Sequence, residues 1–285
     1  MDIATLEGVK RILSDMAEAE YKAFVLRLTN TKYPVLGIRI PKLQSLAKQI
    51  TKGDFNAFLA IPFTFFEHHL LRGMVIALCK EEEAEHLALF EEYLHYVDDW
   101  EGVDLIATRY DCKTESYFSS LRSRLFSDGE FSARFALVAL LHNFASNPAF
   151  TTPILSDVRA LTECGYLRKF SLSADGAPRD IANSASATSS VPHSRLGGYL
   201  PSDLIPETQT EPPSPGYYVM MGAAWLLSVL YLTDKNAVIS YIKDPRVDKN
   251  TRLKTISKIL DSFRVPSEEK RALCLIRDEI KKSLQ

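Results

Sequence analysis

Apolar residues recur with helical spacing along almost the whole chain, and this periodicity limits its fold more than any other feature. In the first such segment, Leu6, Val9 and Leu13 fall on one face of a helix. The predicted helices span residues 6–16, 20–30, 41–50, 65–80, 81–97, 100–110, 115–126, 129–145, 152–164, 217–232, 234–244, 249–263 and 267–284. No stretch alternates with period two over a useful length, so the predicted fold class is all-α.

The lengths of these helices and of their connections indicate how they pack. Many helices of roughly a dozen residues, joined by short polar turns, are typical of antiparallel pairs stacked side by side. No repeat of fixed period stands out in the sequence, so any repeat is structural and degenerate, in the manner of HEAT units. We therefore expect an α-α superhelix (solenoid) of HEAT-like helix pairs. The chain has 285 residues and is predicted to form a single domain over 1–285.

One long segment interrupts this pattern. Residues 166–215 are rich in Ser, Pro, Gly and Ala and poor in periodic apolar residues. Such a segment buries too little apolar surface to offset the entropy lost on ordering. We expect a disordered or poorly packed insertion within an otherwise compact unit, although a linker between two domains is the simpler alternative.

Composition and cysteine usage bear on location. The four cysteines (Cys79, Cys112, Cys164 and Cys274) are widely spaced without a CxxC pair, which favours reduced thiols and a cytoplasmic protein, or a nuclear one in a eukaryote. The sequence lacks the pattern of a signal peptide and any apolar run long enough to span a bilayer. The net charge of −2 argues neither for nor against a polyanionic partner.

Four side chains are candidates for chemistry. Trp100 and Asp104 are four residues apart, so they are neighbours on one face of a predicted helix. The simpler interpretation places Trp100 in the core and makes Asp104 a capping or solvated residue. Trp225 lies in a very apolar helix and is otherwise a core residue. Arg134 begins another apolar helix, where it is otherwise a solvated helix end or a partner of Glu130.

Several motifs in order resemble the DNA alkylation repair proteins of the AlkD type, which are alkylpurine DNA glycosylases built from HEAT-like repeats. The motifs are "YPVLGIRIPKLQSLAKQI", "HHLLRGMVIALC", "DDWEGVDLIA", "FSARFALVALLHNF", "YYVMMGAAWLLSVLYL" and "DKNTRLKTISKILDSFRVPSEEK". No single motif is diagnostic, but together they cover nearly the whole chain outside the insertion.

The resemblance implies a role for each candidate. Asp104 matches the catalytic carboxylate, Trp100 and Trp225 match two aromatic walls, and Arg134 matches an arginine near the DNA backbone. The implied activity is hydrolysis of the N-glycosidic bond of positively charged alkylated purines (3-methyladenine, 7-methylguanine) in duplex DNA, without deep base flipping. The alternative is a catalytically silent HEAT-like scaffold that binds DNA or protein.

Binding of a duplex requires Lys and Arg against phosphates. Basic residues outnumber acidic ones from 233 to 285, whereas 81–101 contains acidic residues and no Lys or Arg. The candidates for phosphate contact are Arg39, Lys42, Arg109, Lys113, Arg134, Lys249, Arg252 and Lys254. For each of them a solvated surface charge is the simpler interpretation.

No cofactor, metal or membrane partner is expected, and the protein is predicted to be a monomer. His68, His69, His86 and His95 lie on predicted helices, but no spacing places three ligands on one face. There is also no GxSxG, no GxGxxG and no glycine-rich phosphate loop. The partner implied by the resemblance is double-stranded DNA containing alkylated purines.

Overall fold

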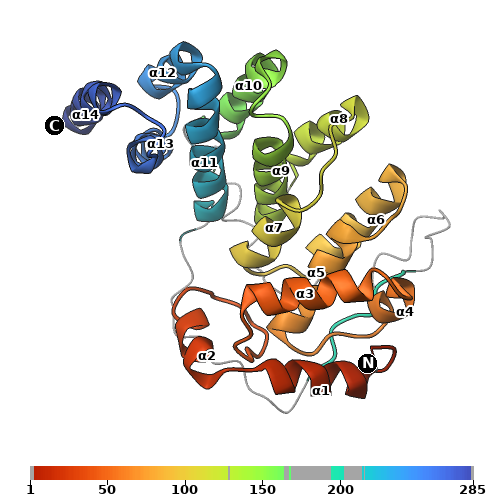
Figure 1. Cartoon of the computed structure of the whole chain (residues 1–285). Coiled ribbons are helices and arrows are strands. Elements are labelled where there is room, and N and C mark those ends of the chain that lie inside the picture. The colour runs from red at the N-terminus through yellow and green to blue at the C-terminus, as the bar shows by residue number, and fades with distance from the viewer. Residues whose placement is uncertain are drawn as a thin grey trace. The chain divides into compact units, whose positions relative to one another are not determined.

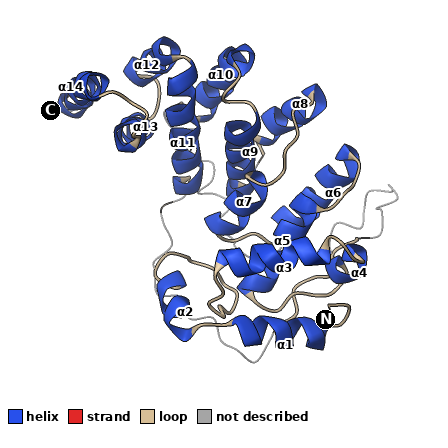
Figure 2. Ribbon diagram, viewed as in Figure 1, coloured by secondary structure: helices blue, strands red, loops and turns tan. Residues whose placement is uncertain are grey.

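The computed structural model describes residues 3–127, 129–163, 167, 194–201, 214 and 216–283. Its described elements are helices and loops without a strand, which confirms the all-α prediction (Figure 2). The chain divides into two compact units: unit 1 comprises Met1–Tyr110 with Gly176–Pro212, and unit 2 comprises Asp111–Asp175 with Pro213–Gln285. We describe each unit by itself, and the single domain over 1–285 stays a prediction.

The helices follow one another along the chain as Figure 1 labels them. Unit 1 contains α1 (Leu6–Met16), α2 (Ala19–Val25), α3 (Ile40–Ile50), α4 (Phe55–Leu59), α5 (Phe66–Leu78), α6 (Glu83–Leu94) and α7 (Trp100–Ala107). Unit 2 contains α8 (Glu115–Arg124), α9 (Glu130–Asn143), the 3-10 helix η1 (Pro148–Phe150), α10 (Thr151–Leu161), α11 (Tyr217–Thr233), α12 (Lys235–Lys243), α13 (Lys249–Asp261) and α14 (Ser267–Lys282). The short elements α4 and η1 were not among the predicted helices, because pieces of three to five residues carry no periodicity.

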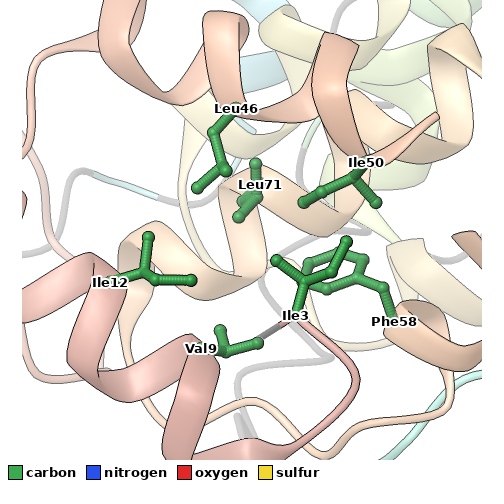
Figure 3. Close-up of a pocket in the computed structure, with 7 residues that line it drawn as sticks. All are labelled: Ile3, Val9, Ile12, Leu46, Ile50, Phe58 and Leu71. Atoms are coloured by element: carbon green, nitrogen blue, oxygen red, sulfur yellow. The ribbon is translucent and has the colours of Figure 1, made fainter. Parts of the chain in front are cut away.

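Helix α5 is the centre of unit 1. Its residues 66–77 are all buried, and α1, α3, α6 and α7 pack around it. Gly73 permits the close approach of α7, because a Cβ there would lie 2.6 Å from Cγ2 of Ile106. Apolar side chains of α1, α3, α4 and α5 line a pocket too narrow to hold a water molecule (Figure 3). The tight packing fixes the positions of α3 and α7 on α5.

The turn before α3 is held by a buried carboxylate. Glu67, which is 2% exposed, accepts hydrogen bonds from the N–H groups of Leu36 (2.9 Å), Gly37 (2.6 Å) and Ile38 (3.3 Å). Gly37 has φ +87, and a Cβ there would lie 2.6 Å from the carbonyl oxygen of Glu18. Burial raises the pKa of Glu67. The turn therefore needs both a glycine and an acceptor inside the core.

Helices α9 and α11 are the centre of unit 2. They pack against each other, α13 packs on α11, and α8 packs on α9. Gly222 keeps α11 close to α9, since a Cβ there would lie 3.2 Å from Cδ1 of Leu137. Asp234 and Asp248 begin α12 and α13 by accepting N–H hydrogen bonds as N-caps.

Residues 194–201, which we call the strap, lie within the segment predicted to be disordered, but they are packed on unit 1. The Phe63 N–H donates to Gly198 O (3.0 Å), and the Leu200 N–H donates to Phe63 O (2.8 Å). Arg195 forms ion pairs with Glu81 (2.5 Å) and Glu85 (3.1 Å). For the strap the prediction of disorder is wrong, because a few ionic and backbone contacts replace the missing apolar periodicity. Apart from Leu167 and Ser214, the rest of the 166–215 insertion lies outside the described residues.

The glycines of the strap offer a matched test of this contact. Gly197→Ala is expected to release the strap, because the added Cβ would lie 2.5 Å from Ala60 O and from Pro62 N. Gly198→Ala is the control, since its Cβ would meet only the Tyr96 hydroxyl at 3.5 Å. Limited trypsin digestion should cleave after Arg195 faster in the first variant than in the control. Equal resistance of the two variants would mean that the strap does not pack as described.

Among the described helices, none combines the length and apolar character needed to cross a membrane. The free cysteines of the described chain are Cys79, Cys112 and Cys274, and Cys164 lies outside the described residues.

Candidate functional site

The buried side chain of Asp99 fixes the start of α7, the helix that carries Trp100 and Asp104. Asp99 is 1% exposed, accepts the Asn30 N–H (3.1 Å) and caps α7 by accepting the Glu101 N–H (2.9 Å). Helix α7 therefore begins at Trp100, whose indole N–H donates to Leu28 O (3.2 Å). Trp100 is partly exposed, so it is not a fully buried core residue.

Asp104 lies one turn further along α7 and is also partly exposed. Its side chain does not cap the helix, because Asp99 does. Its backbone carbonyl accepts the Thr108 hydroxyl at 2.6 Å, which extends the end of α7. The side chain of Asp104 is accordingly not needed to begin or end its own helix.

Carboxylates gather around the start of α7. Burial, followed by repulsion from Asp99, Glu67 and Asp104, raises the pKa of Glu101 to about 7. Burial also raises the pKa of Asp98 to about 6, although Asp98 accepts the Lys32 N–H at 2.6 Å. The carboxylates of Asp99, Glu101 and Asp104 thus act on one another, and such a group opposes further negative charge and favours a cation.

The raised pKa of Glu101 predicts a dependence of stability on pH. Above about pH 4.5 the unfolded chain loses this proton, whereas the folded chain keeps it up to about pH 7. The folded state then binds more protons, so the free energy of unfolding should fall as the pH rises through this window. Glu101→Gln should remove roughly 1–3 kcal/mol of that fall, measured by urea unfolding at several pH values.

The comparison of wild type with Glu101→Gln isolates this group, because Asp98 contributes its own fall at lower pH in both proteins. Parallel pH curves for the two proteins would contradict the assignment.

An open depression of about 300 Å³ lies in the same unit and is lined by Glu20, Tyr21, Phe24 and Arg39. Burial and then the charge of Glu101 raise the pKa of Tyr21. The guanidinium of Arg39 lies 4.9 Å from the centre of the Tyr21 ring. Tyr21 was not a predicted site residue. In the sequence, a tyrosine that binds a ligand and a tyrosine that packs in the core occupy the same positions on the apolar face of a helix.

The two predicted phosphate contacts of this region share one carboxylate. Arg39 Nε lies 2.8 Å from Glu18, and Lys42 Nζ lies 2.7 Å from the same side chain. These hydrogen bonds lower the pKa of Glu18. Both cations are exposed, so a phosphate would have to compete with Glu18 for them.

Unit 2 holds the other two principal candidates: Trp225 is part of α11, and Arg134 of α9 contacts α11. Arg134 is 6% exposed, and its guanidinium donates to Tyr218 O at 2.9 Å, while Glu130 accepts the Tyr218 N–H at 2.7 Å. Arg134 is therefore not a solvated helix end. Trp225 is partly exposed, and Nζ of Lys258 lies 6.0 Å from its ring centre.

The remaining predicted cations differ in exposure. In unit 1, Arg109 donates to Leu105 O at 2.8 Å, and burial lowers its pKa. In unit 2, Lys113 is exposed, Arg252 is 9% exposed, and Lys249 and Lys254 are partly exposed on α13.

The structure brings Trp100 and Asp104 together on α7 of unit 1. In unit 2, Trp225 is part of α11, and Arg134 of α9 contacts the same helix. Convergence of all four on one surface stays a prediction.

No family model, curated protein or solved structure matches this chain. The resemblance to AlkD-type glycosylases therefore depends on the quoted motifs.

No group of three or more His, Cys, Asp or Glu side chains within the described part of the chain could hold a metal ion. His86 is close to Cys79, with 3.7 Å between Nε2 and Sγ, but burial raises the pKa of that thiol to about 11. A neutral thiol is a poor metal ligand and a poor nucleophile.

Proposed function

We propose that this chain is a DNA glycosylase of the AlkD type, with its helices arranged as a solenoid of HEAT-like pairs. Its substrate is duplex DNA containing a positively charged alkylated purine such as 3-methyladenine or 7-methylguanine. The reaction is hydrolysis of the N-glycosidic bond without a metal or cofactor.

The chemistry requires a negative group beside the sugar. A cationic purine is already a good leaving group, so the barrier lies in the oxocarbenium character that develops on the deoxyribose. A carboxylate at Asp104 stabilises that cation and orients the attacking water. Indole faces at Trp100 and Trp225 add cation–π attraction of about 0.5–2 kcal/mol each.

The observation that carries the proposal is the crowding of carboxylates around Asp104. Burial, and then repulsion from Asp99, Glu67 and Asp104, raises the pKa of Glu101 to about 7, as expected where carboxylates lie close together. A cationic transition state relieves this repulsion, whereas a neutral substrate does not. Trp100 and Asp104 also share one face of α7 and are both partly exposed, which leaves them within reach of a ligand.

DNA binding is assigned to cations on other helices. Lys249, Lys254 and Lys258 come from α13, and Arg39 and Lys42 come from the start of α3. Because release of counterions drives such contacts, binding should weaken sharply as salt is raised. Arg39 and Lys42 must leave Glu18 to contact a phosphate, so their contribution is expected to be small.

The decisive experiment is release of free base from a duplex carrying one 7-methylguanine, with an undamaged duplex as control. The purified full chain should release the methylated base faster than spontaneous depurination and leave the control intact. Release should persist in the presence of a chelator. No release above the spontaneous rate would leave the non-catalytic scaffold as the better account.

One observation favours that alternative. Arg134 is buried, and its guanidinium donates to the backbone carbonyl of Tyr218 within unit 2. This hydrogen bond is a structural role rather than a contact with DNA. A chain that fails to release base but still binds duplex DNA with a strong salt dependence would be such a scaffold.

A further inference from the structure

Three basic side chains lie in the apolar centre of unit 1. His68, His69 and Arg72 come from one turn of α5 and are 0%, 1% and 1% exposed. None belongs to the site proposed for Asp104. A cation with three nitrogen atoms is rarely buried without a partner, because its charge loses the solvation of water.

Their nitrogen atoms have no hydrogen-bond partner within the described chain. This holds for Nε, Nη1 and Nη2 of Arg72 and for both ring nitrogens of His68 and His69. Aromatic rings lie beside them: the Phe63 ring centre is 5.2 Å from Cζ of Arg72, and the Tyr93 ring stacks on His69 with 4.3 Å between ring centres. A ring face attracts the charge, but it does not replace hydrogen-bond acceptors for five N–H groups.

The neighbouring carboxylates already have other donors. Glu67 accepts three N–H groups from residues 36–38. Glu92 accepts the Ser194 hydroxyl (2.8 Å) and the Leu196 N–H (3.2 Å) of the strap. The turn of α5 therefore has an excess of donors and lacks an acceptor.

The protonation states of Arg72 and His68 leave both side chains as hydrogen-bond donors. Burial lowers the pKa of Arg72 only to about 10, so the guanidinium remains charged at neutral pH. Burial, and secondarily the charge of Arg72, lowers the pKa of His68 to about 3, so its imidazole is neutral. A neutral imidazole still donates one N–H. His68 also lies in the first turn of α5, a 13-residue helix whose N-terminus favours negative charge.

We propose that this turn of α5 binds a small tetrahedral oxyanion of the phosphate class, held by Arg72 with His68 and His69. Phosphate supplies several acceptor oxygens to a planar guanidinium and suits its paired N–H groups. Because the three side chains are at most 1% exposed, a lipid surface or a nucleic acid cannot reach them, whereas a free ion can enter when the core opens locally. The proposal does not depend on the glycosylase activity.

The strap is the cover through which the ion enters. Tyr199 of the strap packs on Phe63 with 5.2 Å between ring centres, and Phe63 in turn covers Arg72. The strap is held by side-chain and backbone hydrogen bonds, so local opening exposes this region without unfolding a helix. Exchange of the bound ion is expected to be slow, and Gly197→Ala should accelerate it.

The test follows the ¹⁵N resonance of Arg72 Nε by NMR during titration of the full chain with inorganic phosphate. The signal should move from a free to a bound position in slow exchange. Chloride at the same ionic strength should not move it. An Arg72 signal that is indifferent to phosphate would overturn the proposal, with buried water then the better account of the donors.

Thermal unfolding provides a second measure and a control for the general effect of phosphate on proteins. The Tm of wild type and of Arg11→Met, which removes an exposed cation of α1, should rise equally with phosphate concentration. Near a hundred times the dissociation constant, that rise should exceed the rise of Arg72→Met by roughly 5–10 °C. Equal slopes in all three proteins would contradict binding at Arg72. If Arg72→Met does not fold, the NMR titration of wild type decides alone.

Discussion

Asp104→Asn is expected to lower the rate of 7-methylguanine release by about 10²–10³-fold. The amide has nearly the same shape as the carboxylate but lacks the charge that stabilises the developing oxocarbenium ion. Single-turnover kinetics with excess protein measures the chemical step directly. Binding of the damaged duplex should change little, because the carboxylate contributes to the transition state rather than to phosphate contacts.

Two features make this variant a clean test. Asp104 does not cap α7, and asparagine has nearly the same shape as aspartate, so circular dichroism should show the same helical content in the variant as in wild type. Asp15→Asn, an exposed carboxylate of α1 in the same unit, is the matched control and should react as wild type does. An Asp104→Asn protein as fast as wild type would exclude a catalytic role for Asp104.

Glu67→Ala is expected to lower the free energy of unfolding by roughly 3–5 kcal/mol. The substitution leaves the N–H groups of residues 36–38 without their acceptor inside the core. It also removes the group that holds the turn containing Gly37, whose positive φ few other residues adopt. Because this turn leads into α3, we expect the loss to be concentrated in unit 1.

Hydrogen exchange at the amides of Leu36, Gly37 and Ile38 measures this effect locally, and urea unfolding measures it globally. Glu67→Gln is the matched control: it keeps one acceptor oxygen in place and should lose much less stability. Glu20→Ala removes an exposed carboxylate of α2 and should change stability by about 0–1 kcal/mol. Retention of slow exchange at the three amides in Glu67→Ala would show that they have another acceptor.

The candidate site could be predicted only in part from the sequence. Trp100 and Asp104 were identifiable because a spacing of four residues on one helix is a local property. Tyr21 and Glu101 were not, because the effect of the Glu101 charge on the pKa of Tyr21 joins residues far apart in the chain and carries no local signal. Arg134 was identifiable as a cation in an apolar helix, but its hydrogen bond to Tyr218 O joins α9 to α11 and carries no local signal.

The periodicity of apolar residues determined by itself that the described chain is helical and where most of its helices lie, because helical spacing places those residues on one face whatever they pack against. Tertiary structure alone decided that residues 194–201 pack on unit 1, that Glu67 holds the turn at Gly37, and that a charged Arg72 lies in an apolar core. Each of these depends on which groups meet across long sequence separations, and the free energy of a buried charge or hydrogen bond is set by those partners rather than by its neighbours in the chain.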